Sequence, residues 1–353
     1  IYHQTGHVDR AVQLIGQAIT LNPKEVGYYI NCGNALQSLG KLEEAVGSFE
    51  RAIQLKPDYA DAYNNLGRVQ QLLQRPDQAL DSYDQAIRCV PTHAQAWNNR
   101  GLVLKAQGRL QPAKESFEQA LRFNPKYSEA WKNHGDVLFD LKQYDEAVAS
   151  YDYALQLKSD YFDVWNNKGN ALQALNKNEA AILCYDQVIK INGDYSEAWN
   201  NRGNAFKALK NFKEAISSYD RAIEINSKYP EAWNNKGNAL MLLIRLEEAV
   251  HCIQRALDLR SDYKHLQGML FYLRMRICDW SNYSDNIISL SANVVKKFPC
   301  MPASAVSVLI DTLIVQRIAS EVWIEEKNPY SFVLGDIPKR FSADRIRIGY
   351  FSA

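Results

Sequence analysis

Residues 196–229 read SEAWNNRGNAFKALKNFKEAISSYDRAIEINSKY, and residues 230–263 repeat the pattern as PEAWNNKGNALMLLIRLEEAVHCIQRALDLRSDY. Both segments are 34 residues long and align without a gap. In each, a Trp stands four residues before a Gly, and an Ala follows that Gly after twelve and after nineteen residues. Self-similarity at a fixed period is the sequence signature of a repeat architecture.

The same spacing extends over most of the chain. The repeat glycines are Gly33, Gly67, Gly101, Gly135, Gly169, Gly203 and Gly237. Four residues before each one stands an aromatic: Tyr29, Tyr63, Trp97, Trp131, Trp165, Trp199 or Trp233. Sixteen residues after each one stands Phe49, Tyr83, Phe117, Tyr151, Tyr185, Tyr219 or Ile253. The pattern predicts seven complete repeats over 26–263, and a partial repeat over 1–25 that contains Gly6, Ala11 and Ala18.

Residue size explains how such a repeat folds. Each repeat has room for two helices, and the glycine and alanine positions let these helices approach closely. One helix pair cannot bury its apolar face alone, so neighbouring pairs stack into a superhelix with an inner groove. The pattern resembles the tetratricopeptide repeat, which implies an all-α solenoid, an α-α superhelix. We interpret the aromatic residues as packing between repeats rather than as a platform for a carbohydrate or a cofactor.

An asparagine precedes every repeat glycine by two residues, at position 6 of the repeat. We call these seven residues the asparagine ladder: Asn31, Asn65, Asn99, Asn133, Asn167, Asn201 and Asn235. Position 6 lies roughly 200° around the helix from the packed aromatic at position 4, which places it on the inner groove. An amide has one acceptor oxygen and two donor hydrogens, which match the N–H and C=O of a peptide backbone. We therefore predict that the ladder binds an extended polypeptide through its main chain.

The alternative for the ladder is structural: its amides hydrogen-bond to neighbouring repeats and brace the superhelix. Other rows of the groove are polar. The acids at position 2 either favour basic or Ser/Thr-containing ligands or stabilise helix N-termini: Asp61, Glu129, Asp163, Glu197 and Glu231. Position 9 is mostly polar: Asn34, Arg68, Asp136, Asn170, Asn204 and Asn238. The basic residues at position 7 indicate a solvated or salt-bridged face rather than an anion site: Arg100, His134, Lys168, Arg202 and Lys236.

The period ends after Tyr263, and a different pattern follows. We expect a helical cap and linker over 264–340, which begins with an amphipathic helix over 264–279. Two more helices are predicted, at about 283–297 and from about 302 to 326. Residues 345–352, RIRIGYFS, predict a β-strand. Because a lone strand is not stable, we expect residues 341–353 to begin an α/β domain of a longer protein.

These C-terminal residues carry a second resemblance. Repeats with an asparagine at every position 6, followed by Cys278-Asp279-Trp280 and then the segment 345–352, resemble the protein O-linked N-acetylglucosamine transferases of the SPINDLY type. The pattern Pro302, Asp311, Gln316 and Ala319 is similar to that of the bacterial branch of this family. The resemblance implies that the strand opens a two-lobed, Rossmann-like glycosyltransferase domain of the GT-B fold. That domain transfers a sugar from a nucleotide sugar to Ser or Thr hydroxyls of proteins.

The resemblance assigns site residues to only part of this chain. It implies that the ladder guides the acceptor polypeptide. Some members of the family have a His in the region that corresponds to 311–313, and this sequence has none there. We therefore predict no catalytic residue and no cofactor in this chain, and we place the nucleotide-sugar site beyond Ala353.

Composition argues against several other functions. Lys and Arg number 41 and Asp and Glu number 40, and a net charge of +1 argues against binding to a nucleic-acid backbone. The six cysteines form no C-x-x-C pair, which predicts a reducing, cytoplasmic location and no metal site. No apolar stretch has the length that a membrane span requires. No phosphate-binding glycine loop and no hydrolase motif is present.

The sequence thus predicts a protein-binding superhelix that guides acceptor polypeptides to a glycosyltransferase domain, with residues 1–353 themselves inactive. A first alternative is a non-enzymatic scaffold that assembles protein complexes through the groove or the outer face. A second alternative is a self-association module that forms a homodimer through its outer face.

Overall fold

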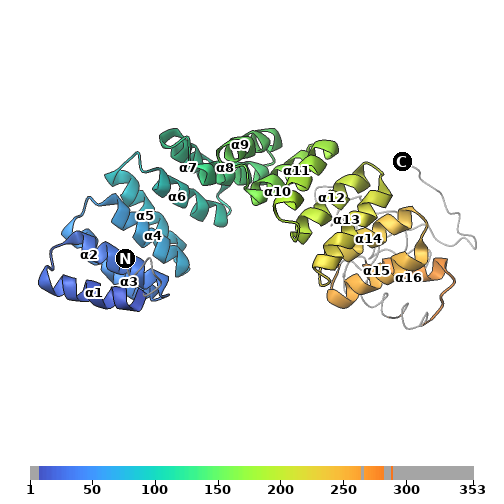
Figure 1. Cartoon of the computed structure of the whole chain (residues 1–353), viewed down its shortest axis with the longest axis horizontal. Coiled ribbons are helices and arrows are strands. Elements are labelled where there is room, and N and C mark those ends of the chain that lie inside the picture. Colours follow the sequence, from blue (N-terminus) through green and yellow to red (C-terminus); the bar gives the residue numbers. More distant parts are fainter. Residues whose placement is uncertain (1–7, 264–265, 282–287, 289–353) are drawn as a thin grey trace, which may run out of the picture. The chain divides into compact units, whose positions relative to one another are not determined.

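The computed structural model describes residues 8–263, 266–281 and 288, and these residues form α-helices and turns without a β-strand. First and second helices of each repeat alternate along the chain (Figure 1). The first helices are α2 (Val26–Ser38), α4 (Ala60–Leu72), α6 (Ala94–Ala106), α8 (Ser128–Asp140), α10 (Phe162–Ala174), α12 (Ser196–Ala208) and α14 (Pro230–Leu242). The second helices are α3 (Leu42–Leu55), α5 (Pro76–Cys89), α7 (Leu110–Phe123), α9 (Tyr144–Leu157), α11 (Asn178–Ile191), α13 (Phe212–Ile225) and α15 (Leu246–Leu259).

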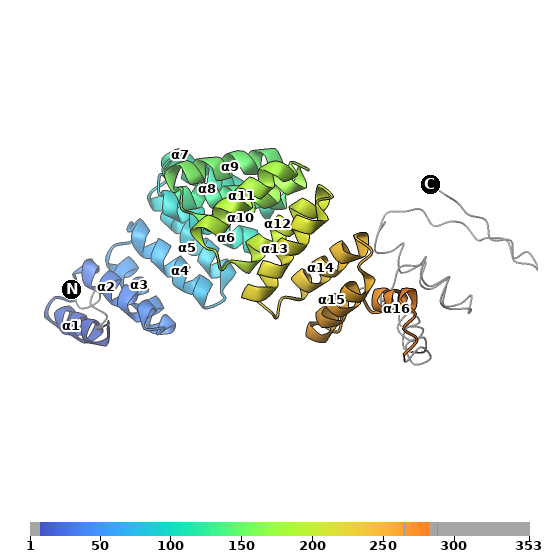
Figure 2. The same ribbon diagram turned by 45° about the vertical axis from the view of Figure 1, so that its right-hand side comes forward.

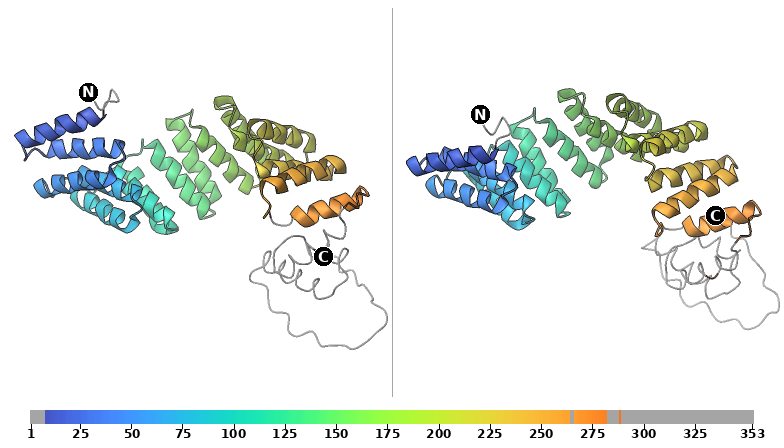
Figure 3. Two further views of the ribbon diagram at one scale, coloured as in Figure 1. Left: turned by 90° about the horizontal axis from the view of Figure 1, so that it is seen from below. Right: turned by 60° about the horizontal axis from the view of Figure 1, so that its bottom comes forward.

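The chain divides into two compact units, residues 1–227 and 228–353. In the first unit, each first helix packs against the second helix of its own repeat and against the second helix that precedes it. Figures 2 and 3 show these helix pairs of the first unit from other directions. In the second unit, α14 packs on α15, and α15 packs on α16 (Leu266–Arg276).

The first helices form the inner layer of the first unit. From α2 to α12, each first helix contacts the first helix of the next repeat, and these helices approach one another more closely than the second helices do. In a curved stack, the elements that approach most closely lie on the concave side. Positions on the exposed side of the first helices therefore face a groove.

The repeat glycine and the residue sixteen positions later form the core contact of each repeat. A Cβ atom placed on any of the first six repeat glycines would lie 2.5–2.7 Å from a ring carbon of that aromatic residue. The rings themselves are at most 1% exposed, and the alanines twelve positions after each glycine are 0% exposed. The close helix contact predicted from residue size is thus present in the structure.

The aromatic at position 4 ties each first helix to the loop before it. The indole N–H of Trp97 donates to the carbonyl of Pro91 at 2.9 Å, and Trp199 donates to the carbonyl of Gly193 at 2.9 Å. Trp165 makes the same bond to Ser159 at 3.0 Å. Because the acceptor is a backbone carbonyl, the loop residue at this position need not be proline, which explains why later repeats lack it.

Both ends of the predicted architecture are described in part. Helix α1 (Val8–Leu21) occupies the place of a second helix and buries Ala11, whereas Gly6 of the predicted partial repeat lies outside the described residues. Helix α16 forms within the predicted segment 264–279. The helices predicted after residue 282 lie outside the described residues, apart from Ile288, and so does the strand predicted at 345–352.

Candidate polypeptide-binding groove

All seven asparagines of the ladder lie on first helices, and their exposure differs along the chain. Asn31 is exposed, whereas Asn133 is only 5% exposed. The remaining five are partly buried. A partly buried amide needs partners for its donor hydrogens, so the question is which of these hydrogens the protein itself uses.

Two ladder amides donate to an asparagine 35 residues earlier, at position 5 of the preceding repeat. Asn99 Nδ2 lies 3.0 Å from Asn64 Oδ1. Asn133 Nδ2 lies 3.0 Å from Asn98 Oδ1. These bonds join neighbouring first helices, which is the contact that the bracing alternative expects.

Asn167 and Asn201 use their donor hydrogens in a similar way. Asn167 Nδ2 donates to Asp136 Oδ1 at 2.9 Å, across to position 9 of the preceding repeat. Asn201 Nδ2 donates to Asn166 Oδ1 at 3.3 Å and to Asn170 Oδ1 at 3.2 Å. These four ladder amides therefore brace the stack, and we call their hydrogen bonds between repeats the brace. Asn201 has no donor hydrogen left for a bidentate contact to a peptide group. Binding of a polypeptide by the ladder stays a prediction.

A second row of asparagines, at position 5, is absent from the sequence-based site. Asn64, Asn98, Asn166 and Asn200 are at most 4% exposed. Asn64, Asn98 and Asn166 supply acceptors for the ladder, whereas Asn200 Nδ2 donates to Asn201 Oδ1 at 3.4 Å. A buried amide in such a position stays only because it is hydrogen-bonded. The recurring Asn-Asn dipeptide was the available signal, since a polar residue next to the packed tryptophan would be costly without a partner.

Position 9 joins the ladder to the packed tyrosines. Asn170 Oδ1 accepts from the Tyr185 hydroxyl at 2.8 Å as well as from Asn201. Asp136 Oδ1 accepts from the Tyr151 hydroxyl at 2.9 Å. Burial is the main cause that raises the pKa of both tyrosines well above the ordinary value, so both hydroxyls stay protonated and act as donors.

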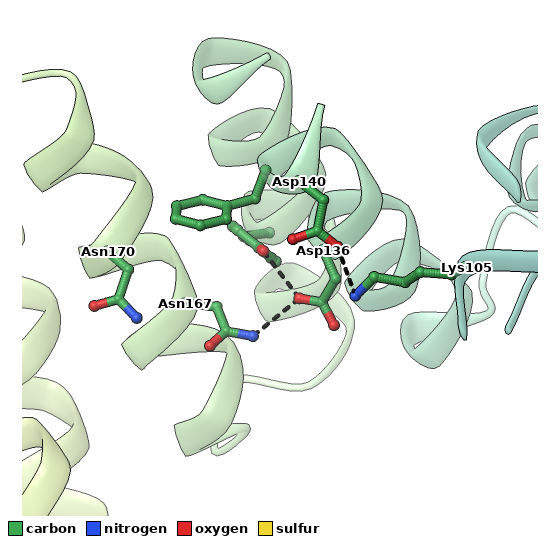
Figure 4. A pocket seen from close by; sticks show the side chains of 7 residues that line it. Lys105, Asp136, Asp140, Asn167 and Asn170 are labelled. Carbon is green, nitrogen blue, oxygen red and sulfur yellow. Dashed lines mark hydrogen bonds and ion pairs between the residues drawn. The ribbon is translucent and has the colours of Figure 1, made fainter. Parts of the chain in front are cut away.

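A pocket of about 230 Å³ opens beside these bonds in the middle of the first unit. Its lining comes from first helices α6, α8 and α10 and from second helix α9: Lys105, Asp136, Phe139, Asp140, Tyr151, Asn167 and Asn170. Figure 4 shows the Asn167 amide directed at Asp136, and Lys105 directed at Asp140. The pocket thus combines the ladder with position 9, and it is a candidate site on the inner layer of the first unit.

Three of the basic residues at position 7 form salt bridges, in line with the predicted solvated or salt-bridged face. Arg100 Nε donates to Asp84 Oδ1 of the preceding second helix at 2.7 Å. Its Nη1 donates to Ser116 Oγ at 2.7 Å. Equivalent ion pairs join Arg202 to Asp186 and Lys168 to Asp152. These contacts connect adjacent repeats and leave no basic stripe for an anionic ligand at these three positions.

His134 replaces the position 7 cation in repeat 4. Burial is the main cause that lowers its pKa to about 4, with Lys114 contributing. The Ser150 hydroxyl donates to the Glu146 carbonyl, so the His134 Nδ1–H donates to Ser150 Oγ at 3.0 Å. The histidine is therefore a neutral structural residue at pH 7.

Several of the acids at position 2 also have partners within the chain. Asp61 Oδ1 lies 3.0 Å from His93 Nε2. Glu197 accepts from Asn166 Nδ2 at 3.1 Å and from the Tyr195 hydroxyl at 2.9 Å. These bonds favour a structural role for position 2 over selection of basic ligands.

Within the described residues, no cluster of three or more His, Cys, Asp or Glu side chains could hold a metal ion. Among residues 8–263 and 266–281, no helix has the length and apolar composition that crossing a membrane requires.

The fold and the groove can be compared with known proteins. Family models described as "TPR repeat" match residues 33–74, 135–176 and 169–210. Models described as "Tetratricopeptide repeat" match residues 58–126, 196–229 and 230–263. No curated protein sequence matches the chain.

Solved structures share the fold at low sequence identity. A chain of the APC/C hetero-tetramer Cut9-Hcn1 is 17% identical, with a TM-score of 0.54, over 68% of this chain and 47% of its own length. The pilF protein of Pseudomonas aeruginosa is 22% identical, with a TM-score of 0.52, over 59% of this chain and 94% of its own length. A tetratricopeptide repeat protein from Parabacteroides merdae is 16% identical, with a TM-score of 0.52, over 71% of this chain and 98% of its own length.

Identities this low show a common fold and nothing more. Stacked repeats of this kind present extended concave surfaces that serve as scaffolds for binding proteins. Since the matched repeats span more than half of the sequence and coincide with the observed helix pairs, the chain belongs to the tetratricopeptide repeat family.

Proposed function

We propose that the inner groove of the first unit binds an extended segment of another polypeptide through its main chain. This proposal rests on the donor and acceptor atoms of the groove asparagines that form no hydrogen bond in the brace. Asn170 uses its oxygen twice and retains an NH₂ group, while Asn167 uses one N–H and retains its oxygen. An extended polypeptide offers an N–H and a C=O at every residue, which complements these groups.

Such a groove would bind weakly per contact and tolerate many sequences. Each hydrogen bond contributes about 0.5–1.5 kcal/mol net, so several repeats must engage one polypeptide together. Main-chain contacts carry no side-chain information. The proposal therefore describes a carrier for unfolded or looped segments rather than a receptor for one motif.

Replacing Asn133, Asn167 and Asn201 together with alanine is expected to weaken binding of unrelated peptides by about tenfold or more, since about three hydrogen bonds are lost. The probes are fluorescein-labelled peptides of alternating glycine and alanine and of alternating glycine and serine, measured by fluorescence anisotropy. The variant will also unfold at a lower temperature because the brace is weakened, so binding is measured where circular dichroism shows both proteins folded.

The matched control for this experiment replaces three asparagines that follow second helices, Asn124, Asn192 and Asn226. This control changes composition equally and is expected to keep peptide affinity. Unchanged affinity in the ladder variant, together with a lower unfolding temperature, would leave the ladder with a bracing role only.

We further propose that the groove delivers acceptor polypeptides to a glycosyltransferase domain of the SPINDLY type that uses a nucleotide sugar. The support is the resemblance carried by Cys278-Asp279-Trp280 and by the segment 345–352. In the described part of this motif, Asp279 follows α16: its N–H donates to the Arg274 carbonyl at 2.8 Å, and its carboxylate accepts from the Ser281 hydroxyl at 2.6 Å. These contacts shape the exit from the repeats.

Turnover of a nucleotide sugar separates this proposal from a purely scaffolding function. Residues 1–353 are expected to show no transfer from UDP-N-acetylglucosamine to a protein acceptor. The longest polypeptide that the gene encodes is expected to show transfer, detected by mass spectrometry of the acceptor. Transfer by residues 1–353 alone would contradict the assignment, and absence of transfer by the longest polypeptide, with GDP-fucose tested as well, would favour the non-enzymatic scaffold.

A further inference from the structure

The hydrogen-bond network fixes which end of the Asn201 and Asn170 amides is left for a ligand. Asn201 donates both of its N–H groups, to Asn166 and to Asn170, so only its carbonyl oxygen, which accepts from Asn200 Nδ2 at 3.4 Å, can take a further donor from the groove. Asn170 accepts twice at its oxygen, from the Tyr185 hydroxyl and from Asn201, so it presents only its NH₂ group. Asn201 at position 6 thus acts as an acceptor, and Asn170 at position 9 acts as a donor.

A peptide group is therefore satisfied by two side chains together rather than by one amide. Residues three apart on a helix have Cβ atoms about 5–6 Å apart, so positions 6 and 9 of one helix are neighbours. Asn204 continues the pattern in repeat 6, where its oxygen accepts from the Tyr219 hydroxyl at 2.9 Å. The acceptor at position 6 and the donor at position 9 suit the N–H and the C=O of a main chain.

Repeat 4 departs from this pattern at Asp136. One carboxylate oxygen accepts from Tyr151 and from Asn167, as the amide oxygen of Asn170 does one repeat later. The other oxygen accepts from Lys132 Nζ at 2.9 Å, where asparagine would present an NH₂ group. Repeat 4 therefore keeps its brace but has no position 9 donor, and a ligand carbonyl at this point would face a carboxylate.

The pocket beside Asp136 adds acceptors. Asn167 has a free oxygen there, since its one side-chain hydrogen bond to the described residues is made by its nitrogen. Asp140 is 43% exposed and pairs with Lys105 through Oδ2 at 3.3 Å, which leaves Oδ1 open to a ligand. Phe139 supplies an apolar wall. The lining suits a side chain with a short apolar stem and a donor at its end.

We propose that Asp136 is a specificity-determining residue that makes this pocket accept a hydrogen-bond-donating side chain of the bound polypeptide. The chemistry is that of a hydroxyl or an ammonium group, as in Ser, Thr or Lys, whereas repeats 5 and 6 hold main-chain groups. This inference rests on the proposed binding of a polypeptide in the groove. Asp136 would thereby set the register of a polypeptide that the rest of the groove binds without side-chain selection.

The test replaces an acceptor at position 9 with a donor and keeps the hydrogen bonds of the brace. Asp136→Asn retains an oxygen for Tyr151 and Asn167, adds the NH₂ group found in Asn170, and removes the ion pair with Lys132. The probes are fluorescein-labelled peptides in which glycine alternates with serine, lysine, alanine or glutamate. The charge-matched control is Asp145→Asn, because Asp145 is exposed on second helix α9, where it pairs with Lys177 at 3.1 Å.

The wild-type protein is expected to bind the serine peptide, the lysine peptide or both about 3–10-fold more tightly than the alanine peptide, which corresponds to one or two hydrogen bonds. Preference for lysine alone identifies an ammonium group, and preference for serine identifies a hydroxyl. In Asp136→Asn the ratio of the affinities for the serine or lysine peptide and for the alanine peptide is expected to fall to about one. The alanine peptide is expected to bind more tightly, because a main-chain carbonyl of the peptide gains the asparagine NH₂ group as a donor.

Three outcomes would overturn the inference. An unchanged ratio in Asp136→Asn, with circular dichroism showing the folded protein, would remove Asp136 as the cause of selectivity. An equal fall in Asp145→Asn would assign the preference to net charge. If the wild-type protein binds none of the four peptides, the proposed groove function fails, and this inference fails with it; binding without selectivity contradicts only the inference.

Discussion

Replacing Gly169 with alanine is expected to destabilise repeat 5 by about 1–3 kcal/mol, the usual range for overpacking a core. The added Cβ atom would lie 2.5 Å from Tyr185 Cε1, which is far inside ordinary contact distance. Tyr185 cannot turn away, because its ring is 0% exposed and its hydroxyl is held by Asn170 at 2.8 Å. The higher helix propensity of alanine offsets this loss by no more than about 1 kcal/mol.

Hydrogen exchange measures this effect where it occurs. Stability in a repeat array is a sum of local terms, so loss of protection is expected to be largest in α10 and α11, on either side of the contact. Gly47→Ala is the matched control, because Gly47 is exposed in second helix α3 with no atom within 4 Å of an added Cβ. This control is expected to gain about 0.5–1 kcal/mol from helix propensity. Equal protection in the two variants would contradict the proposed packing role of the repeat glycine.

Replacing Asn201 with aspartate is expected to destabilise the first unit by about 2–3 kcal/mol at pH 7. The substitution removes both donor hydrogens, and the new carboxylate would face the amide oxygens of Asn166 and Asn170 at the positions now held by hydrogen bonds of 3.3 and 3.2 Å. The buried oxygen of Asn166 would then lack a donor, the oxygen of Asn170 would keep only the Tyr185 hydroxyl, and like partial charges would meet. Urea unfolding followed by circular dichroism measures the loss.

The same chemical change at Asn170 is expected to leave stability within about 1 kcal/mol, because only its oxygen takes part in the brace. Aspartate can still accept from Tyr185 and from Asn201. Asp136 already occupies the equivalent position of repeat 4 and accepts the same two bonds. The pair of variants matches in charge and in size, so equal destabilisation of both would contradict the assigned orientation of the amides.

The helix pairs and their packing could be predicted from the sequence because the contacts that form them are local. Gly203 and Tyr219 are sixteen residues apart, within one repeat, and the helices that carry them pack directly on each other. The salt-bridged character of position 7 was also predictable, since a neutral chain has acids to pair with its cations. The Asn-Asn dipeptide also indicates the buried position 5 row, because a second polar residue beside the packed tryptophan needs a hydrogen-bond partner.

The orientation of the groove amides could not be predicted in the same way. Asn133 and Asn201 occupy the same repeat position, yet Asn133 donates to position 5 of the preceding repeat, and Asn201 donates to both position 5 and position 9. These contacts span 31 or 35 residues and depend on how one helix pair rests on the next. The positions of small and large side chains determine how the two helices of a repeat pack. The hydrogen bonds between repeats depend in addition on how neighbouring repeats stack.

By itself, therefore, the sequence determined that residues 26–263 form an all-α array of 34-residue helix pairs with a row of asparagines on the first helices. Small and aromatic residues at regular spacing allow few other ways to bury apolar surface. Only the tertiary structure decided which amide atoms of those asparagines hydrogen-bond within the protein and which can bind a ligand. The reason is that an amide has both donor and acceptor atoms, and the groups that lie next to it in the folded chain determine which of them are used.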